Sequence, residues 1–244
     1  MMPDTTVLYE KREGLAWVTL NRPRSLNAIN MEMRDALWDI AEAVRDDPDV
    51  RVVIFKGAGE RAFSAGADIS EFGTAPSYVE SRRARQQRDL WGLILSLEKP
   101  LIAALHGYAL GAGIELALCC ALRVAADDAR LGLPEVGLGY IPSAGGTQTL
   151  PRHIPPGVAM RMVLTGDPID AATALRYGLV QRVVPRDRLY DEAESLARTL
   201  MSRGPLALRL AKRAVLEGLE LPLAQGLALE RRLAQRALAG GGIE

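Results

Sequence analysis

The sequence predicts an α/β fold, a spiral of repeated ββα units followed by a C-terminal α-helical region. Strand-like segments followed by a helix recur at a spacing of about 45 residues, without sequence identity between the units. Beyond the segment "LVQRVVP" the pattern becomes almost wholly helical. The chain has 244 residues and is 48% hydrophobic, enough for a sizeable core. We assign residues 1–190 to the spiral core and residues 191–244 to a helical region for oligomerisation.

The N-terminal elements come first. "VLYEKREGLAWVTLNRP" alternates as strands do and predicts two strands around Glu13-Gly14. Asn30 then suits the N-cap of an amphipathic helix from Met31 to about Arg45, because apolar residues recur on one side of it.

The middle of the chain repeats the order of strand and helix. We expect a strand at "VRVVIFKG", a short extended piece at "RAFSAG" and a polar helix that ends near Leu97. "PLIAALHG" then predicts a strand, "GAGIELALCCA" a helix and "LRVAADDARLGL" short strands. A glycine-rich loop leads into "GGTQTLPRHI", and "LVQRVVP" is expected to be the last strand.

The C-terminal part predicts three helices, over residues 186–202, 205–217 and 221–239. Their apolar stripes exceed what a terminal appendage can bury against one core. We therefore expect contacts between subunits.

Composition excludes several classes of protein. Thirty Lys and Arg balance thirty Asp and Glu, so no net field attracts nucleic acid or an anionic membrane. Cys119 and Cys120 are adjacent and lack metal-ligand spacing, so we expect packing residues and no metal site. The apolar window from residue 100 to 122 contains His106, Glu115 and three glycines, which argues against a membrane span. No targeting segment is visible, and we expect a cytoplasmic protein.

Two glycine turns are candidate binding sites. In "AFSAGADISEF", small residues around Gly66 allow a tight turn that exposes amide N–H groups to a ligand; the alternative is an ordinary turn with Asp68 as a cap. In "GYALGAGIELALCC", Gly111, Ala112 and Gly113 precede a helix, where amide donors favour an anion or a developing oxyanion. The alternative there is a packing turn. The stretch lacks the third glycine of the G-x-G-x-x-G fingerprint.

Two carboxylates lie in unusually apolar surroundings. Glu115 is the single charge in "GYALGAGIELALCC", and Glu135 follows a proline in the apolar segment "LGLPEVGLGY". Burial of an ionised carboxylate is costly, and two such groups can divide acid and base roles over one substrate. Each alone has a structural explanation. A hydrolase triad is not supported, because neither histidine has a recognisable Ser/His setting and G-x-S-x-G is absent.

Four ordered stretches give the chain a family resemblance: "NRPRSLNAIN", "AFSAGADISEF", "KPLIAALHGYALGAGIELALCC" and "LGLPEVGLGYIPSAGGTQTLPRHI". From about Val7 to about Arg232 the chain resembles the crotonase (enoyl-CoA hydratase/isomerase) superfamily. The resemblance implies a crotonase-like spiral with helices that assemble trimers, commonly paired as hexamers. It also implies an acyl thioester of coenzyme A as substrate, with no separate cofactor.

The resemblance further implies a mechanism. The amides of Ala67 and Ala112 would hold the thioester oxygen as it becomes an enolate, and Glu115 and Glu135 would flank the double bond. Since both glutamates are present, hydration of a 2-enoyl thioester is favoured: Glu115 helps to deprotonate water for attack at C3, and protonated Glu135 delivers a proton to C2.

The coenzyme A contacts implied by the resemblance come from the first two motifs and the second glycine turn. Arg22 and Arg24 are candidates for phosphate contacts, whereas Ser70 stands where many hydratases have a lysine. The implied binding residues are Arg24, Ser25, Leu26, Ala28, Ala65, Gly66, Asp68, Ile69 and Gly113.

Other functions stay open at this point. One alternative keeps the fold but changes the reaction to double-bond isomerisation, methylglutaconyl-CoA hydration or carbon–carbon bond cleavage. Another is an RNA-binding relative with little activity, for which the basic run "ESRRARQQRD" is either the contact surface or a solvated helix face. The chain lacks the "EGxxAFLEKR" type of final helix, so the motifs leave acyl-chain preference open.

Overall fold

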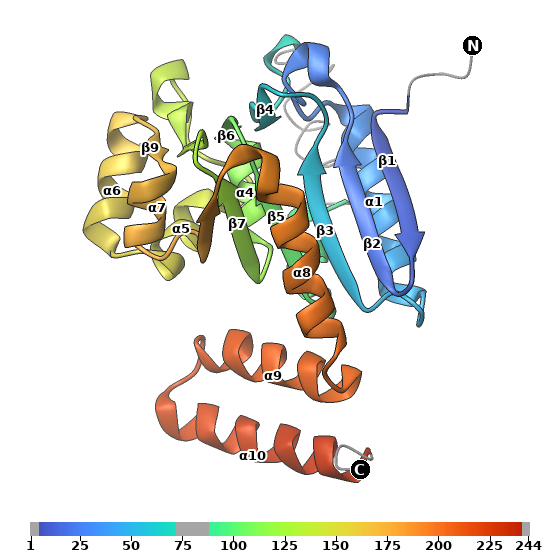
Figure 1. The fold of residues 1–244 in the computed structure, drawn as a ribbon. Coiled ribbons are helices and arrows are strands. Elements are labelled where there is room, and N and C mark those ends of the chain that lie inside the picture. Colours follow the sequence, from blue (N-terminus) through green and yellow to red (C-terminus); the bar gives the residue numbers. More distant parts are fainter. Residues whose placement is uncertain (1–4, 72–87, 241–244) are drawn as a thin grey trace.

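A computed structural model describes residues 5–71 and 88–240 of the chain. Its strands form two sheets (Figure 1). The six-stranded sheet has the order β1-β2-β3-β5-β7-β10, and the four-stranded sheet has the order β4-β6-β8-β9. The strands are β1 (Val7–Arg12), β2 (Leu15–Leu20), β3 (Val52–Gly57), β4 (Ala62–Ser64), β5 (Leu101–Leu105), β6 (Tyr108–Leu110), β7 (Leu122–Ala126), β8 (Arg130–Gly132), β9 (Ile169–Asp170) and β10 (Arg182–Val184).

The two predicted N-terminal strands are confirmed, and they form a hairpin. β1 and β2 pair antiparallel, with Val7 opposite Leu20 and Arg12 opposite Leu15. The two residues between them, Glu13 and Gly14, have φ values of 51° and 82°. Positive φ at both positions is the conformation that a tight hairpin turn requires, which explains the glycine.

The spiral of ββα units is confirmed by the way consecutive strands alternate between the sheets. β3, β5 and β7 lie side by side and parallel in the first sheet. The strand that follows each of them, β4, β6 or β8, lies in the second sheet, where β4 and β8 both pair parallel with β6. Helix α4 (Ala112–Leu118) follows β6, and α5 (Gly146–His153) comes after β8. α4 begins two residues after β6 ends, so the start of this helix lies beside the end of that strand.

Helix α1 (Met31–Asp46) follows the prediction closely. The Asn30 side chain accepts a hydrogen bond from the Met33 amide at 3.0 Å, which is the expected N-cap. Near the end of the expected polar helix the structure has α3 (Leu90–Ser96), an apolar helix that begins after its N-cap Asp89. The preceding part of that expected helix, including residues 80–87 of the basic run, lies outside the described residues.

The central strands β3 and β5 of the six-stranded sheet are buried on both faces. Val53 and Phe55 point into the larger core, which includes α1, α3 and α4, whereas Val52 and Ile54 pack toward helix α8 (Leu189–Met201) on the other face. Neighbouring strand residues point to opposite faces, so a strand buried on both sides is apolar without interruption. That is the pattern seen in "VVIF".

The last two helices form a hairpin apart from the sheets (Figure 1). Helices α9 (Pro205–Gly218) and α10 (Leu223–Ala239) pack on each other around Leu210, Leu229 and Leu233. The three C-terminal helices match the predicted segments, except that a 3₁₀ turn, Arg186–Arg188, precedes α8. Because α8 packs on the sheet, the hairpin that stands apart consists of α9 and α10. The predicted boundary at residue 190, between the spiral core and the helical region for oligomerisation, stays a prediction.

Several elements were not expected from the sequence. They include β6, β9 and the helices α6 (Pro156–Thr165) and α7 (Ala171–Arg176). Among the helices of the described ranges, none is long and apolar enough to cross a membrane.

Candidate active site

The N-terminal turn of α4 is the centre of the candidate site. Gly111 has φ 51° and ψ −128°, and its amide donates to the Gly132 carbonyl at 3.0 Å, which ties the turn to β8. The first helical hydrogen bond runs from the Glu115 amide to the Gly111 carbonyl at 3.0 Å. The Ala112 amide lies ahead of this bond and donates to no backbone carbonyl of the described residues. It is therefore available to an acceptor from outside the chain.

A second turn approaches the first so closely that only glycine fits. Gly66 has φ 103°, and a Cβ on it would lie 2.9 Å from the Leu110 carbonyl oxygen and 3.4 Å from the Ala112 nitrogen. The next amide, that of Ala67, also donates to no backbone carbonyl in the part of the chain that the structure describes. Two backbone N–H groups without a backbone acceptor thus belong to adjoining turns, as an oxyanion-binding site requires.

Glu115 is buried and held by two amides. Its side chain is only 2% exposed, and Oε1 accepts hydrogen bonds from the amides of Ala144 at 3.0 Å and Gly146 at 2.7 Å. Burial raises the pKa of Glu115, and the two amide donors oppose that rise. A Cβ on Gly146 would lie 2.8 Å from Oε1, so the absence of a side chain at residue 146 allows this contact.

Glu135 is buried without comparable partners. It lies in a 3₁₀ turn, Pro134–Leu138, is 3% exposed, and its Oε2 has no hydrogen-bond partner among the described residues. Burial, with a smaller contribution from the charge of Glu115, raises its pKa to about 7. A Cβ on Gly111 would lie 3.0 Å from Glu135 Oε1. Both glutamates therefore border the start of α4 in unlike surroundings.

The first motif packs directly against the Gly66 turn. The Leu26 carbonyl accepts from the Ala65 amide at 2.9 Å, Ile29 donates to the Gly66 carbonyl at 2.8 Å, and the Asp68 amide donates to the Ile29 carbonyl at 3.1 Å. The loop contains an uncommon backbone conformation, because Leu26 has φ 51°. The two segments expected to contact coenzyme A, residues 25–28 and 65–69, are thus brought together.

Asn27 organises this junction and was missed by the sequence reasoning. It is fully buried, donates to the Ala58 and Ala62 carbonyls at 2.9 and 2.8 Å, and accepts from the Arg22 amide at 2.9 Å. It also has positive φ, 55°, and its own carbonyl accepts from Ser64 Oγ. Asn tolerates the left-handed region and can hydrogen-bond several backbone groups at once. These two properties of Asn27 in "RSLNAIN" could have indicated its role in this loop.

Arg22, a candidate for a phosphate contact, forms two contacts within the protein. Its guanidinium forms an ion pair with Asp68 at 2.8 Å and donates to the Ala28 carbonyl at 2.6 Å. A phosphate contact of Arg22 stays a prediction. Asp68 also accepts from the Ser70 amide and hydroxyl, which makes it the cap that the alternative interpretation described and keeps its pKa low.

The other implied binding residues differ in exposure. Arg24, Ser25 and Ile69 are exposed, and Ala28 and Ala65 are half-buried. Gly113 is buried, and a Cβ on it would lie 2.7 Å from the Cβ of Ser64, so this glycine allows α4 to pack on β4. Ligand contacts of all these residues stay predictions.

The fold and site define a class of protein, the crotonase fold with two buried carboxylates beside paired amide donors. A sequence model described as enoyl-CoA hydratase/isomerase matches residues 10–240, and the chain belongs to this family.

Proteins similar in sequence or structure align with this chain over nearly its whole length. A crotonyl-CoA hydratase of Syntrophomonas wolfei is 43% identical over 225 residues, which are 92% of this chain and 86% of the relative. An (E)-benzylidenesuccinyl-CoA hydratase of Thauera aromatica is 42% identical over 91% of this chain and 86% of its own. The crystal structure of an enoyl-CoA hydratase from Bacillus anthracis superimposes with a TM-score of 0.91 at 38% identity, covering 96% of this chain and 91% of that one.

Proposed function

We propose that this chain adds water to a 2-trans-enoyl-CoA to give the 3-hydroxyacyl-CoA, and is thus a hydro-lyase. The observation that carries the proposal is the pair of buried glutamates, Glu115 and Glu135, beside the start of α4. Hydration needs a base for the water and an acid for the carbon that receives a proton, and two carboxyl groups in unlike surroundings supply both. The names of the relatives support the same reaction.

The proposed reaction begins at the thioester. Its carbonyl oxygen accepts hydrogen bonds from the Ala67 and Ala112 amides, which stabilise the negative charge that develops as C3 is attacked. The Glu115 carboxylate takes a proton from water while the water oxygen bonds to C3. Protonated Glu135 then delivers its proton to C2 as the enolate collapses, and both new bonds form on the same face.

The surroundings of the glutamates support this division of roles. Glu115 accepts two amide N–H bonds, which stabilise its anion and suit a base. Glu135 has an unpartnered Oε2 and a pKa of about 7, so a substantial fraction holds a proton at neutral pH. A proton donor with a pKa near the working pH is the efficient choice.

For substrate binding and assembly we propose the following. The segments at residues 25–28 and 65–69 bind the coenzyme A moiety, supported by their mutual hydrogen bonds. The chain assembles as a trimer or a dimer of trimers, supported by exposed leucines on and between α9 and α10, such as Leu219 at 71% and Leu223 at 78%. The enzyme acts in the cytoplasm in fatty-acid or related acyl-CoA metabolism. It needs no cofactor, and neither nucleic acid nor membrane is a partner.

The direct test is loss of the conjugated enoyl-thioester absorbance when purified protein meets crotonyl-CoA. We expect Glu115→Gln and Glu135→Gln each to lower kcat by about two to four powers of ten, because each removes a positioned acid or base. Glu42→Gln, on α1 with a side chain that is 42% exposed, is the matched control and should keep wild-type turnover. Near wild-type turnover in both folded site variants would refute the assigned roles.

A second outcome separates the alternatives. If the wild type leaves crotonyl-CoA unchanged but converts a 3-enoyl-CoA into the conjugated isomer, the protein is an isomerase and the proposal of hydration fails.

A further inference from the structure

The strongest unexplained group outside the site is a buried arginine. Arg123, in β7, is 1% exposed and has no carboxylate partner within the described residues. Its Nε donates to the Leu179 carbonyl at 2.6 Å, and its Nη1 to the carbonyls of Cys120 at 2.5 Å and Ala117 at 3.4 Å. Burial lowers its pKa. A buried charge is costly, so an arginine satisfied by carbonyls at a helix end calls for an explanation.

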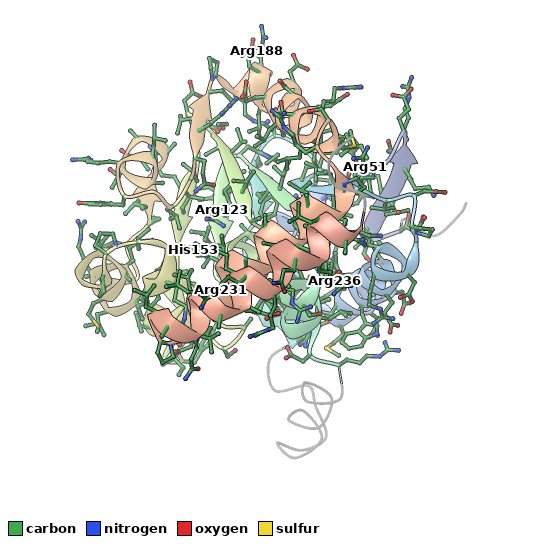
Figure 2. All side chains as sticks on the ribbon, turned by 90° about the horizontal axis from the view of Figure 1, so that it is seen from below. Arg51, Arg123, His153, Arg188, Arg231 and Arg236 are labelled. Atoms are coloured by element: carbon green, nitrogen blue, oxygen red, sulfur yellow. The ribbon has the colours of Figure 1, made fainter. Side chains whose placement is uncertain are left out.

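Arg123 also contacts the far end of α5. Its Nη2 lies 3.3 Å from Nδ1 of His153, and Figure 2 shows the two side chains next to each other. Arginine has no acceptor, so Nδ1 must accept and the neutral ring carries its proton on Nε2. Burial, assisted by the charge of Arg123, lowers the pKa of His153 to about 4, which keeps the ring neutral. Nε2 then donates to the Leu118 carbonyl at 3.3 Å.

These contacts join α4 and α5 at the ends away from the proposed reaction. Ala117 and Leu118 are in the last turn of α4, and His153 is the last residue of α5. At the opposite ends, the first residue of α5, Gly146, donates to Glu115 in the first turn of α4. The two helices are therefore fixed to each other at two places, one of which is the hydrogen bond that holds the Glu115 carboxylate.

We propose that Arg123 and His153 are a pair of positioning residues that hold α5 against α4 and thereby place the Gly146 amide on Glu115. The inference rests on the proposed function, because Glu115 is the base in that reaction. Neither residue is expected to touch substrate. Their loss leaves every reacting group present but lets the start of α5 move, and a displacement of about 1 Å in an active site lowers turnover up to a hundredfold.

The test compares variants of His153 in the full-length protein. His153→Leu removes both the acceptor for Arg123 and the donor to Leu118, whereas His153→Gln supplies one of each. We expect His153→Leu to lower kcat for crotonyl-CoA by about tenfold to a hundredfold with KM nearly unchanged, and His153→Gln to restore most of it. The matched control is His106→Leu, since the buried ring of His106 also bonds a backbone carbonyl, that of Gly59, at 3.0 Å.

The pH profile distinguishes positioning from loss of stability. Without the amide donors the pKa of Glu115 rises further, so the acid limb of kcat in His153→Leu should move to higher pH. The other titratable groups that interact with Glu115 are Glu135, from its 3₁₀ turn, and Cys119, which directly follows α4, and both are unchanged. We expect the control His106→Leu to keep the wild-type kcat and the wild-type acid limb. The same result for a folded His153→Leu would overturn the proposal.

A measurement independent of turnover completes the test. Hydrogen exchange of the Gly146 amide should be faster in His153→Leu, and unchanged exchange there would contradict the inference. If His153→Leu does not fold, Arg123→Lys replaces it in the test, with the same expected results. Lysine keeps the positive charge but lacks the several N–H donors of the guanidinium group. If the wild type fails to hydrate any enoyl-CoA, the proposed function falls, but the exchange experiment still decides whether the pair positions α5.

Discussion

Replacement of Glu135 by glutamine should reveal a pH-dependent cost of folding. The neutral Glu135 carboxyl group and the glutamine amide have similar size, so the variant keeps the shape and removes the charge. In the folded protein the pKa of Glu135 is about 7, against 4.5 for the free side chain, chiefly because the group is buried. Between these pH values the folded state binds more protons than the unfolded state, so stability must fall as pH rises.

The magnitude follows from that interval. At 1.36 kcal/mol per pH unit, the difference between 4.5 and about 7 corresponds to about 3 kcal/mol. This contribution to stability is fully present below pH 4.5 and lost as pH rises past about 7. Relative to Glu135→Gln, the wild type should thus become less stable by up to about 3 kcal/mol over this range, because only the wild type must bury an ionised carboxylate.

The assay is urea unfolding of both proteins at pH 5, 6, 7 and 8, followed by tryptophan fluorescence at one protein concentration. The difference between the two free energies of unfolding isolates Glu135, since all other groups titrate in both proteins. Glu42→Gln, whose carboxylate is partly exposed, should give no pH-dependent difference of that size. A wild-type-minus-variant difference that is constant from pH 5 to 8 would refute the reasoning.

Two further predictions concern activity and the turn before α4. The value of kcat/KM for crotonyl-CoA should fall as pH rises above about 7, because Glu135 loses the proton that it delivers to C2; a profile flat to pH 9, recorded by enoyl absorbance, would exclude it as the acid. Gly111→Ala should lower both turnover and stability, the latter by about 1–3 kcal/mol, since residue 111 has φ 51° and the new Cβ would lie 3.0 Å from Glu135 Oε1. Its control is Gly137→Ala, which meets no atom within 4 Å; equal thermal unfolding midpoints and activities for the two variants would contradict the prediction.

Local signals in the sequence predicted much of the fold. The N-cap at Asn30, the two strands around Glu13-Gly14 and the strand in "VRVVIFKG" depend on residues close in the chain, and the structure confirms them. The short helices α6 and α7 were missed. Proline at the start of α6 and the Asp170 N-cap of α7 are signals that could have indicated them.

The site was only partly predictable, because its contacts join distant residues. Glu115 and Glu135 drew attention as charges in apolar segments, and their burial is confirmed. Nothing local indicates that Glu115 is held by the amides of Ala144 and Gly146, about thirty residues away, or that Arg22 pairs with Asp68, 46 residues away. Such pairs depend on how the turns of the spiral stack, which no short window of sequence specifies.

The two free amides near the start of α4 have a consequence for how this site can change over evolution. The amides of Ala67 and Ala112, which we propose as donors to the thioester oxygen, belong to the main chain, so any replacement except proline keeps the N–H group. Mutation can therefore reshape what surrounds a substrate without deleting these donors. Among the relatives, one name specifies a crotonyl thioester and another a benzylidenesuccinyl thioester. Main-chain donors that persist when the side chains around them are substituted allow relatives to differ in substrate.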